Sequence, residues 1–439
     1  MDKEPKIKVG ITERADTLEG KFNGAFSAGE TRLDGAFTAR AETSGIALTD
    51  AAGTAVTHPH RLRCAGKEKA TFTLRGIIIG MNFHWQREQE QSFAGDLVLA
   101  LHEDGTLTAI NEVPLETYLI SVISSEMKAT APAEFLKAHA VTSRSWLAAM
   151  LARGKTLAGS GARQAPHQNG EIIRWYDREE HARFDVCADD HCQRYHGLGG
   201  VTEAAAAAVQ ATRGTFLVYG EEICDARYYK ACGGRTENFE TAWEDEPRPY
   251  LVSVADSATA HPPLQTEEDA RRWILSKPDA WCNTADGELL RQALPSFDQE
   301  TPDFFRWRVA YERRELEDIL REKSGIDFGT LKNIAPLSRG PSGRISRLRI
   351  EGSQAAVTVG KELEIRRWLS HSHLLSSAFV VTAETGADGV PARFIIDGAG
   401  WGHGVGLCQI GAAVMAAKGF SAEQILKHYF RGTQLKKLY

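Results

Sequence analysis

The stretch VPLETYLISVISSEM, residues 113–127, changes the pattern of the chain from strand to helix. Pro114 suits the first position of a helix, where no backbone amide donor is needed. Apolar side chains then recur at helical spacing, at Leu115, Tyr118, Leu119, Val122 and Ile123. The stretch therefore predicts a short helix with one buried face.

Glu126 continues that apolar face, because it lies three residues after Ile123 and four after Val122. A carboxylate there is either desolvated or opens into a cleft, and desolvation raises its pKa. A general acid that works near neutral pH needs such a raised pKa. Alternatively, Glu126 turns to solvent at the helix end or pairs with Lys128 or Arg144. The spacing alone makes Glu126 a candidate acid/base and leaves both interpretations open.

The chain on either side of this helix alternates between strand and helix patterns. Residues 6 to about 110 have the alternation and β-branched runs of strands, with a hairpin where Asp104 and Gly105 separate residues 97–101 from 107–111. A second helix is predicted from about Pro132 to Arg153, where Gly154 can end it.

The later part of the chain completes an α+β pattern. Helices are predicted near residues 204–208, 267–276 and 312–323, and a capping box at 421–424 opens a final one; strands are predicted at 216–229, 345–350 and 393–396. We expect a β-rich core with a helix pair and a glycine-rich loop. The expected division is an N-terminal β region (1–95), a core (96–260), an insertion or second lobe (261–390) and the rest of the core (391–439).

Bulk composition excludes some classes of function. The 439 residues carry a formal net charge of −6, so there is no global basic field to hold nucleic acid. No apolar run approaches the roughly 20 residues that a bilayer span needs. The charged start lacks the apolar core of a secretory signal, which leaves open a cytoplasmic protein or one whose signal has been removed.

Several motifs of this chain resemble the SpoIID/LytB family. They are residues 113–127, EFLKAHAVTSRSW at 134–146, CGGRTE at 232–237, GAGWGHGVGLCQIGA at 398–412 and ILKHYFRGT at 425–433. The resemblance covers roughly residues 105–260 and 390–439, with the blocks in the family's order. Two residues depart from the family's pattern, since its usual Pro is Lys128 here and its usual Gln is His139.

The resemblance implies a lytic transglycosylase that acts on peptidoglycan glycan strands in the cell envelope, outside the cytoplasm. In this scheme Glu126 protonates the oxygen between N-acetylmuramic acid and N-acetylglucosamine. The same carboxylate then accepts the proton of the sugar's 6-hydroxyl, which closes an anhydro ring. One carboxylate therefore suffices, unlike in the two-carboxylate glycosidase scheme.

The segment HARFDVCADDHC, residues 181–192, gathers two thiols and two imidazoles. Zinc accepts His181, Cys187, His191 and Cys192 as four tetrahedral ligands, and a closed set of this kind indicates a structural site. A buried thiol pair or a disulfide is the alternative from spacing alone; the resemblance favours zinc, because some relatives carry it at this loop. Of the seven cysteines, only this pair lies among other plausible ligands in the sequence.

The glycine-rich loop around His403 is a second candidate region. Its spacing fits neither a P-loop nor a dinucleotide-binding fingerprint. We expect His403 and Gln409 to line the sugar cleft near Glu126, although a hydrogen-bonded core role for His403 is equally compatible. Other candidate substrate contacts are Trp401, Tyr228 and Arg144.

Two other functions compete with the transglycosylase. One is a non-catalytic peptidoglycan-binding protein that stimulates a cell-wall amidase, which the family's modifier members suggest and which adds other cell-wall hydrolases as partners. The other is a zinc amidase, which is disfavoured because a catalytic zinc needs an open coordination position and a nearby base.

Overall fold

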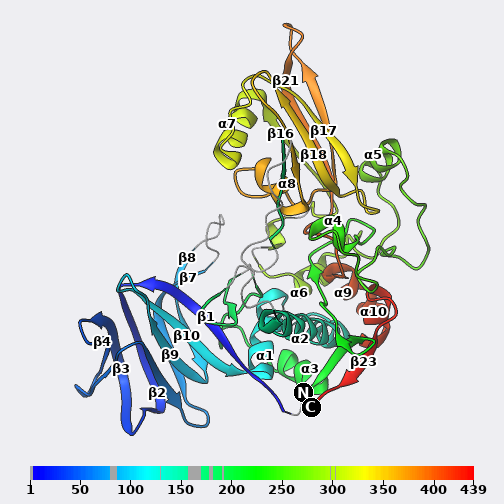
Figure 1. Cartoon of the computed structure of the whole chain (residues 1–439). Coiled ribbons are helices and arrows are strands. Elements are labelled where there is room, and N and C mark those ends of the chain that lie inside the picture. Colours follow the sequence, from blue (N-terminus) through cyan, green and yellow to red (C-terminus); the bar gives the residue numbers. More distant parts are fainter. Residues whose placement is uncertain are drawn as a thin grey trace. The chain divides into compact units, whose positions relative to one another are not determined.

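A computed structural model describes residues 3–79, 87–128, 130–156, 170–176, 181–189, 192–296, 298–301 and 303–439. The chain forms two compact units (Figure 1). The first unit contains residues 1–130, 180–215 and 437–439, and the second contains residues 131–179 and 216–436. Both units mix helices and strands, which confirms the predicted α+β class.

One large, mainly antiparallel sheet dominates the first unit. Its strand order is β12-β1-β10-β9-β6-β2-β3-β4-β5, with β7 and β8 attached through β2. The bounds are β1 Lys6–Ala15, β2 Thr17–Ala28, β3 Thr31–Glu42, β4 Gly45–Asp50, β5 Ala55–His58, β6 Arg61–Gly66, β7 Thr71–Ile79, β8 Arg87–Ala94, β9 Asp96–Leu101, β10 Leu107–Pro114 and β12 Val186–Cys187. Side chains on one face alternate inward along β2, where Leu18, Phe22 and Phe26 are buried.

The predicted Asp-Gly hairpin joins β9 and β10, which pair with Leu107 opposite Leu101. Strand β10 leads directly into helix α1 (Leu115–Glu126), so Pro114 is the cap residue, one position before the helix. All five apolar side chains of the predicted stripe are buried, with at most 1% exposed. Helix α3 (Glu203–Ala211) packs against α1 and begins at Thr202, whose side chain accepts a hydrogen bond from the Ala205 amide.

Helix α2 (Ala133–Thr156) belongs to the second unit and is longer than predicted. Gly154 does not end it, because a helix tolerates an interior glycine at a cost of about 1 kcal/mol when the flanking turns hold. Helices α9 (Gln409–Ala417) and α10 (Ala422–Tyr429) pack against α2. The predicted capping box at the start of α10 is confirmed, with Ser421 and Gln424 bonding each other's backbone amides.

Two further sheets of the second unit enclose a separate core (Figure 1). One has the order β11-β19-β18-β17 and the other β16-β21-β20. Helices α7 and α8 cover this core, whose largest fully buried side chain is Trp368. The bounds are β11 Glu171–Ile173, β16 Arg306–Glu312, β17 Leu331–Arg339, β18 Ile345–Gly352, β19 Ala356–Gly360, β20 Phe379–Thr385, β21 Pro391–Ala399, α7 Arg313–Ser324 and α8 Glu362–Trp368.

Short elements connect the rest of the second unit. They are β13 Thr215–Tyr219, β14 Glu222–Ile223, β15 Tyr228–Tyr229, β22 Leu407–Cys408, β23 Gln434–Lys437, α4 Phe239–Ala242, α5 Glu267–Leu275, α6 Gly287–Ala293 and the 3-10 turn Asp298–Glu300. The predicted helices near 267–276 and 312–323 are confirmed as α5 and α7. Among the described residues, no helix combines the length and apolar character required to cross a bilayer.

Candidate functional site

Glu126 is the last residue of α1, and its side chain is partly exposed. The helix ends because Met127 adopts an extended backbone and is itself fully buried. One carboxylate oxygen, Oε1, accepts a hydrogen bond of 3.0 Å from the backbone N–H of Arg194. The acid is therefore held in a defined orientation by main chain from a distant part of the sequence.

The segment that supplies this N–H, residues 181–196, is fastened along α1. Tyr118 donates its hydroxyl hydrogen to Gln193 Oε1 at 3.1 Å, and the backbone N–H of His196 donates to Ser121 Oγ at 3.2 Å. The rings of Tyr118 and Tyr195 stack with centroids 5.1 Å apart. These contacts hold the Arg194 amide in place beside the end of the helix.

A group of metal-ligand side chains lies in the same segment. The ligand atoms of His181, Cys187 and Cys192 all lie within 4.8 Å of one another, and His181 Nε2 is 3.4 Å from Cys192 Sγ. Cys187 is fixed by β12, which runs parallel to β1 with Gly10 opposite Cys187. Two thiolates and one imidazole are a donor set that suits zinc.

Two further residues of this segment, His191 and Asp185, differ from these three. His191, the fourth predicted ligand, lies outside the described residues. The carboxylate of Asp185 accepts a hydrogen bond of 2.9 Å from the Lys8 amide, which fastens the segment to β1. The described part of the segment thus supplies three ligand atoms, with its backbone attached to the sheet.

The phenol of Tyr118 lies close enough to Glu126 and to two thiols of the metal-ligand group for their charges to affect its pKa. Burial raises the pKa of the Tyr118 phenol well above its usual value, and charges on Cys192, Cys187 and Glu126 raise it further. The phenol therefore stays protonated and keeps its hydroxyl as a hydrogen-bond donor. Glu126, Cys187 and Cys192 therefore all lie near Tyr118 in the first unit.

A second polar group lies in the second unit. His139 of α2 is fully buried, and its Nε2 lies 3.3 Å from Gln409 Nε2 at the start of α9. Its ring stacks on Phe135 and meets Tyr228 edge to face at 4.8 Å. Burial lowers the pKa of His139 to about 3, with help from the charge of Lys230, so the imidazole is neutral at physiological pH.

The glycine-rich loop runs beside this group, and all four of its alternating glycines have positive φ, between 78° and 98°. Trp401 pairs with Ala231 through two backbone hydrogen bonds, and Lys230 Nζ lies 6.0 Å from the centre of its ring. Arg344 donates two hydrogen bonds to the Gly402 carbonyl, at 3.1 and 3.0 Å. The loop is thereby held in one conformation.

His403 is partly exposed but well surrounded. Its Nδ1 accepts a hydrogen bond of 3.1 Å from the Val405 amide, and its ring meets Tyr229 and Trp243 edge to face. Burial and the neighbouring charge of Arg227 hold its pKa well below its usual value. His403 is therefore a neutral, hydrogen-bonded side chain.

The predicted site residues divide between the two units. Glu126 and the described metal-ligand residues lie in the first, and the second holds Arg144, Tyr228, Trp401, His403 and Gln409. The structure brings Tyr228 and Gln409 together around His139. Arg144 is fully buried, so direct contact with a substrate would require its surroundings to open. The expected position of His403 and Gln409 near Glu126 stays a prediction.

Sequence reasoning missed several groups. The Arg194 backbone N–H on Glu126 is invisible to it, because every residue type except proline carries that group. Spacing in the sequence indicates only Cys187 and Cys192 as clustered ligands, whereas in the structure three other cysteines, Cys232, Cys282 and Cys408, also converge on Asp256. They lie 50 and 126 residues apart in the chain, so no spacing motif could reveal them.

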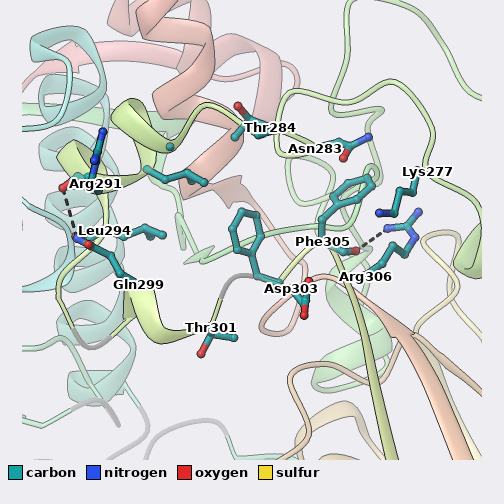
Figure 2. A pocket seen from close by; sticks show the side chains of 14 residues that line it. Lys277, Asn283, Thr284, Arg291, Leu294, Gln299, Thr301, Asp303, Phe305 and Arg306 are labelled. Atoms are coloured by element: carbon teal, nitrogen blue, oxygen red, sulfur yellow. Dashed lines mark hydrogen bonds between the residues drawn. The ribbon is translucent and has the colours of Figure 1, made fainter.

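A separate cavity of about 630 Å³ opens in the second unit (Figure 2). It is lined by α6 and its flanking residues, among them Lys277, Arg291 and Phe305. Arg306 at its edge donates hydrogen bonds to four backbone carbonyls. None of the predicted site residues that the structure describes lines this cavity.

Comparison with known proteins finds relatives of this chain. A model of the stage II sporulation protein matches residues 103–219, and one of a domain of unknown function matches residues 237–406. Stage II sporulation protein D of Bacillus amyloliquefaciens is 23% identical over 334 residues, which cover 75% of this chain and 76% of that protein. Its counterpart in Bacillus subtilis (strain 168) is 24% identical, with the same coverage. The amidase enhancer of the latter organism is 23% identical over 243 residues, 52% of this chain and 32% of that protein.

The chain carries a SpoIID region at residues 103–219 and is similar to proteins of the SpoIID/LytB family. The resemblance that the sequence motifs indicated is thereby confirmed. The SpoIID match includes Glu126, Arg194 and the three described metal-ligand residues, so the acid and the cluster lie in the family's own region. Trp401 and His403 fall instead in the part that matches the domain of unknown function.

Proposed function

We propose that this SpoIID/LytB protein is a peptidoglycan lytic transglycosylase with Glu126 as its acid/base. The observation that carries the proposal is the partly exposed carboxylate at the end of α1, whose Oε1 is bonded to the Arg194 amide. A general acid must reach substrate and also hold a fixed orientation. Glu126 meets both requirements.

In the proposed reaction, protonated Glu126 delivers its proton to the glycosidic oxygen between N-acetylmuramic acid and N-acetylglucosamine. The bond from that oxygen to the muramic acid anomeric carbon breaks, and the ring becomes oxocarbenium-like. The carboxylate then takes the proton of the sugar's own 6-hydroxyl, whose oxygen attacks the anomeric carbon. The products are a free N-acetylglucosamine 4-hydroxyl and a 1,6-anhydro-muramic end, and Glu126 is again protonated.

The hydrogen bond from Arg194 supports both halves of this cycle. The backbone N–H on Oε1 restricts rotation of the carboxylate, so the same group stays oriented while it donates and then accepts a proton. General acid/base assistance of this kind contributes roughly 10²–10⁴-fold in rate. The Arg194 amide is thus a positioning group for the acid.

A zinc ion held by His181, Cys187 and Cys192, with His191 as the predicted fourth ligand, would supply a structural crosslink and no chemistry at the sugar. Two thiolates bonded to the metal would keep residues 181–192 folded. The Arg194 amide follows this segment directly. In this proposal the cluster acts on catalysis only by fixing the position of Glu126.

Digestion of purified glycan strands tests the proposal. Glu126→Gln keeps the size of the side chain and removes its acidity, so anhydro-muramic ends should fall by at least about 100-fold. Binding to insoluble peptidoglycan should be unchanged. Glu103→Gln, an exposed glutamate in the turn before β10, is the matched control and should keep full activity.

Three results would contradict the assignment. Full activity of the Glu126→Gln protein would reject Glu126. Reducing muramic ends in place of anhydro ends would indicate a hydrolase. Freed stem peptides would indicate an amidase.

A second candidate function is the non-catalytic enhancer of a cell-wall amidase, which the match to an amidase enhancer favours. This alternative predicts binding to peptidoglycan without release of soluble glycan, and faster stem-peptide release when an amidase is added. Glu126→Gln should then leave the stimulation intact. Either function places the protein at the cell envelope, outside the cytoplasm.

A further inference from the structure

Three cysteines and one aspartate converge in the second unit. They are Cys232, Asp256, Cys282 and Cys408, and one ligand atom from each lies within 4.8 Å of the others. All four residues are buried, with at most 2% exposed. We call this group the Cys3Asp cluster.

Separate parts of the fold bring the four residues together. Strands β15 and β22 run parallel with Tyr229 opposite Cys408, which places Cys232 just beyond the end of β15 near that thiol. The Asp256 amide donates to the Gly234 carbonyl at 3.0 Å, and the Trp281 amide donates to the Asp256 carbonyl at 2.7 Å. The backbone thus fixes the positions of all four side chains.

The spacing of the sulfur atoms fits a single metal ion. Cys232 Sγ and Cys282 Sγ lie 3.4 Å apart, well beyond the roughly 2.0 Å of a disulfide bond. Two thiolates of a tetrahedral zinc site with bonds of about 2.3 Å lie about 3.8 Å apart. A cage of this size suits one ion and is too narrow for a cluster of several irons.

The sulfur and carboxylate atoms of the cluster accept hydrogen bonds from nearby groups, as the ligands of bound metals usually do. The Gly234 amide donates to Cys232 Sγ and the Cys232 amide donates to Cys408 Sγ, each at 3.3 Å. Asp256 accepts the Tyr429 hydroxyl at 2.6 Å and the Cys282 amide at 2.9 Å. These donors stabilise negative charge on sulfur and oxygen.

Positive charge lies close by. Arg344 donates a hydrogen bond of 3.2 Å to the Cys232 carbonyl, and Arg306 donates one of 2.9 Å to the Gly233 carbonyl. Cys408 precedes helix α9, whose N-terminal end favours an anion. Three thiolates, one carboxylate and a divalent cation carry a net charge of −2, which the two guanidinium groups offset.

We propose that the Cys3Asp cluster binds one zinc ion as a closed structural site. Thiolates and a carboxylate are ligands that zinc accepts, and four protein ligands leave no open position for catalysis. The ion joins the segment after β15, the Asp256 and Cys282 loops and the start of α9. It thereby anchors the end of the glycine-rich loop at Cys408, next to Gln409.

Zinc content of the purified full-length chain tests this site. A Cys187→Ser, Cys192→Ser double variant removes the thiols of the other cluster, so its remaining zinc reports on the Cys3Asp cluster alone. We expect one zinc per chain in this protein and less than one tenth after Cys408→Ser is added. Cys224→Ser, a buried cysteine of the same unit outside the cluster, should leave the zinc content unchanged.

A spectroscopic measurement guards against variants that fail to fold. X-ray absorption at the zinc edge of the folded double variant should show three sulfur ligands at about 2.3 Å and one oxygen at about 2.0–2.2 Å. In the unsubstituted protein, the zinc content should be two per chain when both clusters are loaded. This inference does not depend on the transglycosylase activity.

Three outcomes would overturn the proposal. If the folded double variant contains no metal after purification from zinc-containing medium, the site is rejected. A disulfide between any two of the three cysteines in freshly isolated protein would replace the metal by a covalent link. Iron with acid-labile sulfide would assign the cluster to a different cofactor.

Discussion

Gly404 lies where the glycine-rich loop passes the guanidinium group of Arg344. Its φ is +85°, a backbone conformation that side chains with a Cβ rarely adopt, and an added Cβ would lie 2.5 Å from Arg344 Cζ. Arg344 cannot yield easily, because the same guanidinium holds the Gly402 and Cys232 carbonyls. Two separate constraints therefore require glycine at this position.

Gly404→Ala and Gly419→Ala separate these two constraints. Gly419 has a similar φ of +90°, but nothing lies within 4 Å of an added Cβ. Both variants carry the backbone cost, whereas only Gly404→Ala also displaces Arg344. We expect Gly404→Ala to lower the free energy of unfolding by about 2 kcal/mol more than Gly419→Ala in urea denaturation. Equal losses would show that Arg344 adjusts freely.

At the scale of single residues, the sequence predicts which side chains are buried better than it predicts their hydrogen-bond partners. The apolar spacing of α1 correctly gives its five buried apolar residues and places Glu126 after them. It cannot give the Arg194 amide 68 residues away, because a backbone donor has no sequence signature. The Cys3Asp cluster could not be predicted for a related reason. Its ligands are far apart in the sequence, and the pairing of β15 with β22 brings two of them together.

The segment of residues 181–196 is the element on which the acid depends. One end carries His181, Cys187 and Cys192, and the other carries the Arg194 amide that bonds Glu126. Among its described residues, 181–189 and 192–196, the one strand is β12, which has two residues. The contacts along α1 also hold the segment, and we expect the thiols to contribute.

Cys187→Ser combined with Cys192→Ser should therefore impair catalysis from a distance. We expect kcat on glycan strands to fall about 10- to 100-fold, since small displacements of a catalytic group cost rates of this order. KM should change less, and hydrogen exchange of residues 181–196 should accelerate. Cys64→Ser, a buried cysteine of the same unit, is the control. Unchanged kcat in a folded double variant that has lost the metal of this cluster would show that the cluster does not position the acid.

Elements were predictable where local chemistry dictates them. The Asp-Gly hairpin before α1 and the capping box of α10 were both correct, because turn and cap residues act within four positions. The strands β16, β17, β19 and β20 were not predicted. Register shifts interrupt β17, and its many polar side chains hide the period of two on which strand prediction depends.

At the scale of the whole molecule, the second unit contains several neutral histidines that are buried or half-buried. Burial lowers the pKa of His139 to about 3 and those of His373 and His428 to about 4. Unfolding exposes these rings, which then bind protons below their ordinary pKa of about 6.5. The unfolded state therefore takes up more protons than the folded state between pH 6.5 and 4, and stability falls as the pH falls. Glu237 acts in the opposite direction, because burial raises its pKa.

The His139→Gln variant removes one of these titrating rings, so it measures the contribution of that ring alone. Glutamine is also the residue that the family pattern usually has at this position. The folded protein keeps His139 neutral down to about pH 3, so acidification from pH 7 to 5 costs about 2 kcal/mol through this ring alone. Urea denaturation at both pH values gives the decrease in the free energy of unfolding between them. This decrease should be smaller by that amount in His139→Gln than in the unsubstituted protein. The difference is independent of any stability change common to both pH values, such as lost stacking on Phe135. His58→Gln, an exposed histidine of the first unit, should reproduce the unsubstituted pH dependence. If His139→Gln reproduces it too, His139 binds its proton equally well in the folded and unfolded states, and burial does not keep the ring neutral at pH 5.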